Sequence, residues 1–111
     1  MTTDPKTRRI RQLNDTFRKT FQGGKVYITK GIATLPKDLR PQMLMAVRTF
    51  TAFTEDNDPY GEHDFGAITL GGFKVFWKID TYAPDMMHGS DDPADPAKTV
   101  RVLTIMLAEE Y

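Results

Sequence analysis

The sequence predicts an α+β fold: an antiparallel sheet of three or four strands, centred on a 65–82 hairpin, packed against N-terminal, middle and C-terminal helices. Two strand-like runs joined by Gly71-Gly72, a typical two-residue hairpin turn, predict the sheet. Apolar residues that repeat at helical period at three places along the chain predict the helices. With 111 residues, of which 40% are hydrophobic, we expect one domain over residues 1–111.

The first helix is expected over residues 4–21. Asp4 and Pro5 match an N-cap and a first helical position, and Gly23-Gly24 is expected to end the helix. One apolar stripe runs along it, formed by Ile10, Leu13, Phe17 and Phe21. Four basic residues fall mostly off that stripe and are expected to face solvent or a partner: Arg8, Arg11, Arg18 and Lys19.

A strand and a second helix are expected next. Residues 25–29 are β-branched and aromatic, which is typical of a strand. Leu35-Pro36 and Arg40-Pro41 bracket the start of the middle helix, because proline is tolerated only in a first turn. Its apolar stripe consists of Met43, Ala46, Val47 and Phe50.

The hairpin has a predicted register. If Leu70 faces Phe73, then Ile68 opposes Val75, and Trp77 and Ile79 continue the same face. The same register places His63 opposite Asp80. The other face carries Phe76, Tyr82, Lys74 and Lys78, which suit a stacking surface for single-stranded nucleic acid unless a helix covers them.

The C-terminal segment allows two interpretations. Asp95-Pro96 resembles another helix start, and a helical stripe follows it, formed by Val100, Leu103, Met106 and Leu107. The Leu, Met, Ala and Glu residues towards the end also favour a helix. Residues 100–106 nevertheless alternate like a strand, so both structures stay open over residues 99–108.

The segment 55–64 concentrates polar chemistry, with five carboxylates and one histidine in ten residues. His63 opposite Asp80 would suit a general acid–base pair. A metal site could use Asp56, Asp58, Glu62 and His63. The structural alternative is a solvated acidic turn with a His–Asp cross-strand pair.

Net charge is zero, but the charges are unevenly distributed. Residues 1–30 carry eight Lys or Arg and two Asp, and residues 55–64 carry five acids and no base. The absence of cysteine excludes disulfides and thiolate metal sites. No apolar run approaches the roughly 20 residues of a membrane span. No signal-peptide core follows the polar start, so we expect a cytoplasmic location.

Four runs resemble a family of small bacterial proteins known only as a domain of unknown function and often found on plasmids and other mobile elements. The runs are residues 10–15, 56–66, 76–80 and 101–108, and the resemblance extends from about residue 8 to residue 111. It implies a single-domain protein in a mobile-element setting and assigns no catalytic residues. One departure is Thr81, where the family pattern has an aromatic residue.

Two classes of function are therefore expected. The first is a non-enzymatic binding or accessory protein that acts on a host protein or a nucleic-acid complex, without a cofactor. Its expected binding residues are Arg8, Arg11, Arg18, Lys19, Asp56, Asp58 and Glu62. The alternative is a small metal-dependent hydrolase or nuclease that uses His63 and the carboxylates of residues 55–64, which we name the acidic loop.

Overall fold

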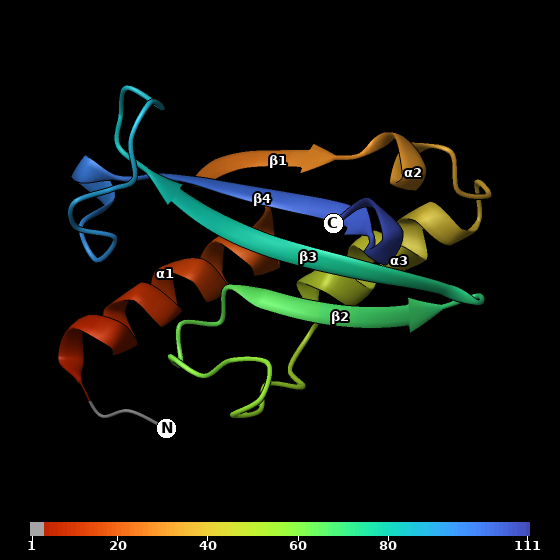
Figure 1. The fold of residues 1–111 in the computed structure, drawn as a ribbon, viewed down its shortest axis with the longest axis horizontal. Helices are drawn as coiled ribbons and strands as arrows, with labels where there is room; N and C mark the ends of the chain where they lie inside the picture. The colour runs from red at the N-terminus through yellow and green to blue at the C-terminus, as the bar shows by residue number, and fades with distance from the viewer. Residues whose placement is uncertain (1–3) are drawn as a thin grey trace.

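The computed structural model describes residues 4–111, and the first three residues of the polar start lie outside the described residues (Figure 1). Four strands form one sheet in the order β1-β4-β3-β2. The elements follow the chain as α1 (Pro5–Thr20), β1 (Gly24–Ile28), α2 (Lys30–Ala33), α3 (Leu39–Arg48), β2 (Phe65–Leu70), β3 (Phe73–Tyr82), the 3-10 turn η1 (Pro96–Lys98), β4 (Val100–Leu107) and the 3-10 turn η2 (Ala108–Glu110).

Helix α1 lies close to its predicted position. Asp4 caps its first turn by accepting a backbone hydrogen bond, and Pro5 occupies the first helical position, as predicted. The helix ends at Thr20, earlier than predicted, because Phe21 adopts the left-handed conformation with φ of 58°. Gly23, with φ of 97°, instead forms the turn into β1, and Gly24 is the first residue of that strand.

The middle of the chain also follows the predictions. Strand β1 matches the predicted strand, and α3 carries Pro41 within its first turn, where the missing N–H costs no helical hydrogen bond. Met43 and Val47 on its stripe are fully buried. The short helix α2, a single turn, was not predicted.

The hairpin forms in the predicted register. Ile68 lies opposite Val75, and Phe65 lies opposite Lys78 at the far end of the pairing. Gly71 and Gly72 have φ of 60° and 82°, as a type I′ turn requires.

The favoured C-terminal helix is wrong, because residues 100–107 form strand β4 at the centre of the sheet. Apolar side chains line both faces of this strand, which is typical of a strand with neighbours on both sides and not of a helix stripe. Asp95 and Pro96 do form a helical N-terminus, but only that of the short 3-10 turn η1, where Asp95 accepts a hydrogen bond from the Ala97 N–H. The expected antiparallel sheet is correct for two of its pairs, whereas β1 runs parallel to β4.

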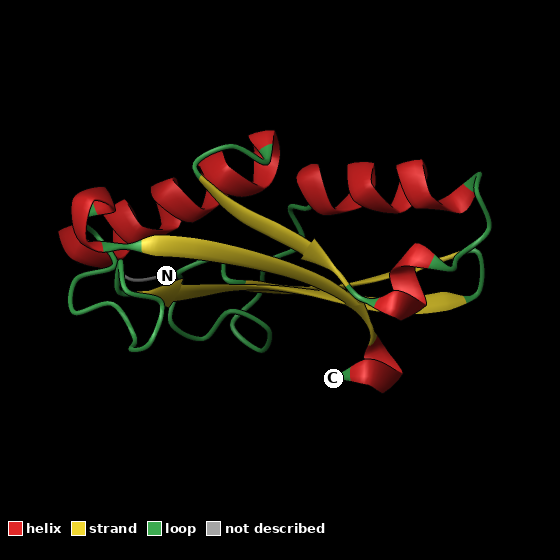
Figure 2. Ribbon diagram, turned by 90° about the horizontal axis from the view of Figure 1, so that it is seen from above, coloured by secondary structure: helices red, strands yellow, loops and turns green. Residues whose placement is uncertain are grey.

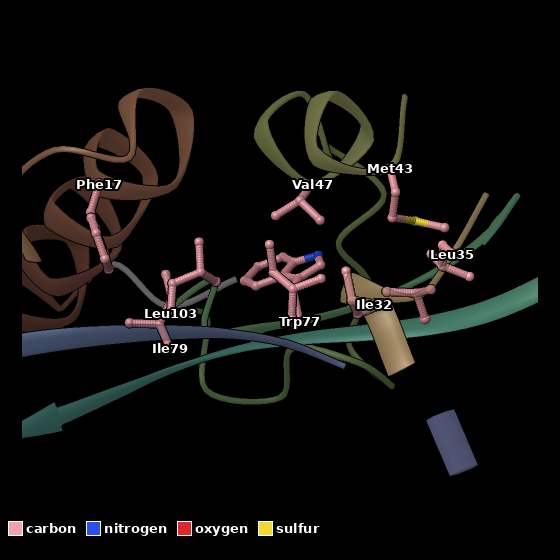
Figure 3. Close-up of a cluster of buried hydrophobic side chains, with 10 residues drawn as sticks. Phe17, Ile32, Leu35, Met43, Val47, Trp77, Ile79 and Leu103 are labelled. Atoms are coloured by element: carbon pink, nitrogen blue, oxygen red, sulfur yellow. The ribbon is translucent and has the colours of Figure 1, made fainter. Parts of the chain in front are cut away.

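The sheet has one covered and one open face. Figure 2 shows α1 and α3 on the same side of the strands, and only the C-terminal turn η2 adds helical structure to the other side. The core fills the space between the helices and the covered face, with Trp77 at its centre (Figure 3). Ile10, Phe17, Val75, Trp77 and Leu103 are buried as predicted, whereas Leu13, Ile68 and Leu107 are only partly buried.

Within residues 4–111, none of the helices has the length and apolar character needed to cross a bilayer.

Candidate functional site

His63 lies in the loop between α3 and β2, under helix α1. A tight turn places it there: the Gly61 N–H donates to the Asp58 carbonyl, and the His63 N–H donates to Asp58 Oδ1 at 3.0 Å. His63 itself has φ of 54°, a left-handed conformation that is uncommon outside glycine. Because of this left-handed backbone conformation at His63, the extended conformation of β2 does not continue back from Phe65 to His63. The imidazole is turned towards the helices.

The imidazole ring is held on three sides. Its Nδ1 lies 2.9 Å from Asp15 Oδ1, and because a carboxylate only accepts, Nδ1 carries a proton. Its Nε2 lies 3.5 Å from Asp58 Oδ2. The ring stacks on Phe53 with centroids 3.6 Å apart and planes 2° from parallel. His63 Nε2 is shielded from solvent and has no hydrogen-bond partner among the described residues.

Arg18 completes this group, which we name the His63 cluster: Asp15, Arg18, Phe53, Asp58 and His63. The Arg18 guanidinium is 1% exposed and donates to the backbone carbonyls of Val47 and Phe50 as well as to Asp15. It also lies 5.3 Å above the ring of Phe53. The cluster therefore fastens α1 to the end of α3 and to the following loop. The prediction that Arg18 faces a partner is wrong, because the loop covers it.

The predicted pair of His63 and Asp80 does not form. The strand pairing ends at Phe65 and Lys78, and the left-handed kink at His63 removes it from the extrapolated register. Asp80 instead makes an ion pair with Lys78 at 3.0 Å on the open face. These two candidate catalytic residues thus belong to different sides of the sheet.

The acidic loop does not gather its carboxylates. Asp56 is exposed, Asp58 is buried beside His63, and Glu62 is half-buried. Burial raises the pKa of Glu62, with Asp64 and Asp58 acting in the same direction and Arg101 acting against them. Across residues 4–111, no three His, Asp or Glu side chains are arranged to hold a metal ion. The proposed ligands Asp56, Asp58, Glu62 and His63 are thus not arranged as a metal centre in the described structure.

The basic helix and the acidic loop lie against each other. Arg11 donates to the Gly61 carbonyl at 3.2 Å, so its head group is partly used by the fold. Arg8 and Lys19 are exposed. The contacts between helix and loop run through backbone carbonyls and through the Asp15–His63 pair, which leaves the outer charges on both elements at the surface.

Two buried polar residues were not predicted. Asn14 is 1% exposed, accepts from Arg101 Nε at 2.7 Å and donates to the Glu62 carbonyl at 3.0 Å. Its position four residues after Ile10 and three before Phe17 was the available signal, because it places a polar side chain on the apolar stripe. Arg101 had no such signal, because its burial depends on strand β4, in a segment where the sequence left both helix and strand open.

The open face of the sheet carries aromatic and basic side chains. We use the name open face for the strand residues that point away from the helices: Lys25, Tyr27, Phe65, Ala67, Thr69, Lys74, Phe76, Lys78, Asp80, Tyr82, Val100, Val102, Thr104 and Met106. Tyr27 is 52% exposed. Phe65 and Phe76 contact each other at 5.2 Å, and the terminal Tyr111 packs on both.

One row of the open face crosses all four strands. Tyr27 lies beside Thr104, Thr104 beside Lys78, and Lys78 beside Phe65. An aromatic ring therefore stands at each edge of the sheet, roughly 14 Å apart at about 4.8 Å per strand. A hydrogen bond to Asp80 is the main cause that raises the pKa of Lys78, with Tyr82 and Tyr111 adding to it.

These features define a two-layer α+β protein with one helix-covered and one open sheet face. The family model of DUF3768, a protein of unknown function, matches residues 28–110, so the chain belongs to this family. The predicted membership in a family of unknown function is thereby confirmed. The matched range includes most of the sheet but leaves α1 outside. No curated protein and no solved structure matches the chain.

Proposed function

We propose that this protein is a non-enzymatic binding protein that receives single-stranded nucleic acid on the open face of its sheet. The observation that carries the proposal is the row Tyr27, Thr104, Lys78 and Phe65, in which exposed or half-exposed aromatic rings flank a lysine. Bases stack on aromatic side chains regardless of sequence, and lysines between them attract the phosphates.

The shape of the sheet supports this proposal. Among the described elements no α-helix covers the open face, although Tyr111 packs on Phe65 and Phe76 towards its β2 edge (Figure 2). A flexible strand of nucleic acid is therefore expected to lie over the part of the face from Tyr27 to Lys78. Tyr27 on the edge strand β1 offers the most exposed ring of that row. A rigid duplex presents no free base faces, so single strands are the expected ligand.

The local charge supports it as well. Lys25 and Lys74 are exposed on the open face, and Lys74 Nζ lies 5.7 Å from the centroid of Phe76. Asp80 is the acidic strand residue on this face, and its charge is compensated by Lys78. The strand residues of this face therefore carry a net positive charge, with three lysines and one aspartate, although the whole chain is neutral. With few lysines, stacking is expected to supply more of the affinity than phosphate contacts.

The His63 cluster supports binding over catalysis. Its polar groups fasten the fold together, and His63 Nε2, which lies 3.5 Å from Asp58 Oδ2, is shielded from solvent. We further propose that the protein acts as an accessory factor of a mobile element on a host nucleic-acid complex, the setting that the family resemblance implies.

Fluorescence anisotropy with a labelled single-stranded oligonucleotide tests the proposal. Wild type should bind at low salt and prefer the single strand to the matching duplex. Tyr27→Ala should weaken binding by about 1–3 kcal/mol through lost stacking. Lys74→Glu should also weaken binding and make the salt dependence shallower, by about 0.7 in the log–log slope for the lysine lost.

Two matched controls separate this surface from general effects. Tyr60→Ala removes a tyrosine that is 78% exposed in the acidic loop, and Lys37→Glu reverses an exposed lysine before α3. Both should bind as wild type. Absence of binding at low salt, or equal losses in the control variants, would refute the open face as the binding surface.

A further inference from the structure

A cavity lies on the covered side of the sheet, away from the open face. It has a volume of about 540 Å³, within the range of roughly 300–1,000 Å³ typical of small-molecule sites. Helix α1 forms one wall, and the turn before β1 and the start of β4 form the others. Its polar lining comes from Arg9, Gln12, Thr16, Gln22 and Arg101.

Arg101 brings a buried positive charge to this cavity. The residue is 4% exposed, yet no carboxylate of residues 4–111 makes an ion pair with it. Its Nε donates to Asn14 and its Nη2 donates to the Pro93 carbonyl. Nη1 has no hydrogen-bond partner in the described part of the chain. Charged side chains are rarely buried unless an opposite charge accompanies them.

Arg9 adds a second positive charge to the cavity. It is exposed on α1, lines the same cavity and forms no ion pair with a described carboxylate. Burial is the main cause that lowers the pKa of Arg101, and the nearby charge of Arg9 lowers it further, against a smaller opposing effect of Glu62. Two guanidinium groups facing one cavity disfavour each other until an anion enters between them.

The other residues that line the cavity suit the rest of an anionic ligand. Gln12 and Thr16 from α1 and Gln22 from the following turn offer further hydrogen-bond donors for phosphate oxygens. Leu13, Phe17 and Pro96 supply an apolar wall. We propose that this cavity binds an organic phosphate monoester, with Arg9 and Arg101 on the phosphate and the apolar wall against the carbon skeleton. Planar guanidinium groups bind phosphate oxygens in pairs, and two of them neutralise its dianion.

Isothermal titration calorimetry with AMP, adenosine and inorganic phosphate tests this site in the full chain. AMP should bind, inorganic phosphate should bind more weakly for want of the apolar wall, and adenosine should not bind. Arg9→Gln should weaken AMP binding at least about tenfold, because it removes one of the two charge-assisted contacts to the phosphate. Arg8→Gln removes an equal charge from the neighbouring helical position and should leave the affinity unchanged.

Arg9 carries the test because it is exposed, whereas Arg101→Gln also breaks the bonds to Asn14 and Pro93 and is expected to destabilise the fold. Failure of both AMP and inorganic phosphate to bind would overturn the proposal. So would equal affinities of the Arg9→Gln and Arg8→Gln variants. Neither result bears on the open face, because the two surfaces lie on opposite sides of the sheet.

Discussion

Single buried polar side chains decide how α1 is attached to the rest of the molecule. Asn14 joins it to β4 and to the acidic loop, and Arg18 joins it to the end of α3. Hydrogen bonds to charged groups contribute about 1.5–3 kcal/mol each, so these few contacts are large against the total stability of a small domain. The acidic loop is thereby fixed to a helix that carries six of the 15 basic residues.

At the residue scale, the carboxyl group of Asp64 makes stability depend on pH. Burial raises its pKa above the ordinary value of 3.8, the charges of Asp58 and Asp80 raise it further, and its own backbone N–H and His63 act in the opposite direction. The folded state then holds this proton more tightly than the unfolded state does. Stability is therefore lost as pH rises from the ordinary value through the raised one.

Asp64→Asn removes this loss and should stabilise the protein more at pH 7 than at pH 3, relative to wild type. Urea unfolding of both proteins at the two pH values measures the difference. Asp56→Asn, a change to an exposed carboxylate of the same loop, serves as the control. A stabilisation by Asp64→Asn that is equal at both pH values would contradict the burial of an ionised Asp64.

The sequence could predict only part of this residue-scale picture. His63 was recognised as a central residue, but its partner was taken from an extrapolated strand, and the left-handed kink at His63 has no sequence signal comparable to glycine. The true partner Asp15 lies 48 residues away on a helix, so helical periodicity alone could not bring the two together. Arg18 lies off the helical stripe, and only the packing of a distant loop buries it.

At the scale of elements, Trp77 on β3 is the centre of the core. It is fully buried, Phe50 meets its ring edge-on at 5.5 Å, and the guanidinium of Arg18 lies 5.0 Å from the ring. Gly66 on β2 leaves the space for the indole, because a Cβ there would meet Trp77 Nε1 at 2.4 Å. The indole N–H has no hydrogen-bond partner among the described residues.

Trp77→Ala should therefore cost about 3–5 kcal/mol of unfolding free energy. Trp77→Phe should cost clearly less, since it keeps most of the apolar contact and removes a buried N–H without a partner. Because this is the single tryptophan of the chain, circular dichroism should follow the denaturant-induced unfolding in place of fluorescence. An unfolding midpoint that does not change in Trp77→Ala would place the residue at the surface and contradict the assignment of the sheet faces.

Elements with local signals were predictable, and elements defined by distant neighbours were not. The Gly71-Gly72 turn fixed the hairpin register, and Pro41 marked the start of α3. Strand β4 resembled a helix because its central place puts apolar residues on both of its faces, and these residues also match a helical stripe. The alternation over residues 100–106 therefore did not decide between helix and strand. Its parallel pairing with β1, across most of the chain length, has no local signature.

At the scale of the whole molecule, the zero net charge conceals three surfaces with different character. The strand residues of the open face are basic and aromatic, the acidic loop is negative, and the outer side of α1 is positive. The sequence indicated the separation of charge between the helix and the loop. Whether the aromatic and basic residues of the open face are exposed depends on which side of the sheet the helices cover. The topology decides this, so the sequence left open whether a helix covers these residues (Figure 1).

Chemical-shift mapping tests the central claim, the use of the open face for binding, most directly. Backbone amide resonances of isotope-labelled protein are followed while an unlabelled single-stranded oligonucleotide is added at low salt. The largest shifts are expected on β1 and β3, at Lys25, Tyr27, Phe76 and Lys78, with small shifts along α3. Shifts that concentrate instead on α1 near Arg8 and Arg11, or an unchanged spectrum at saturating oligonucleotide, would contradict the claim.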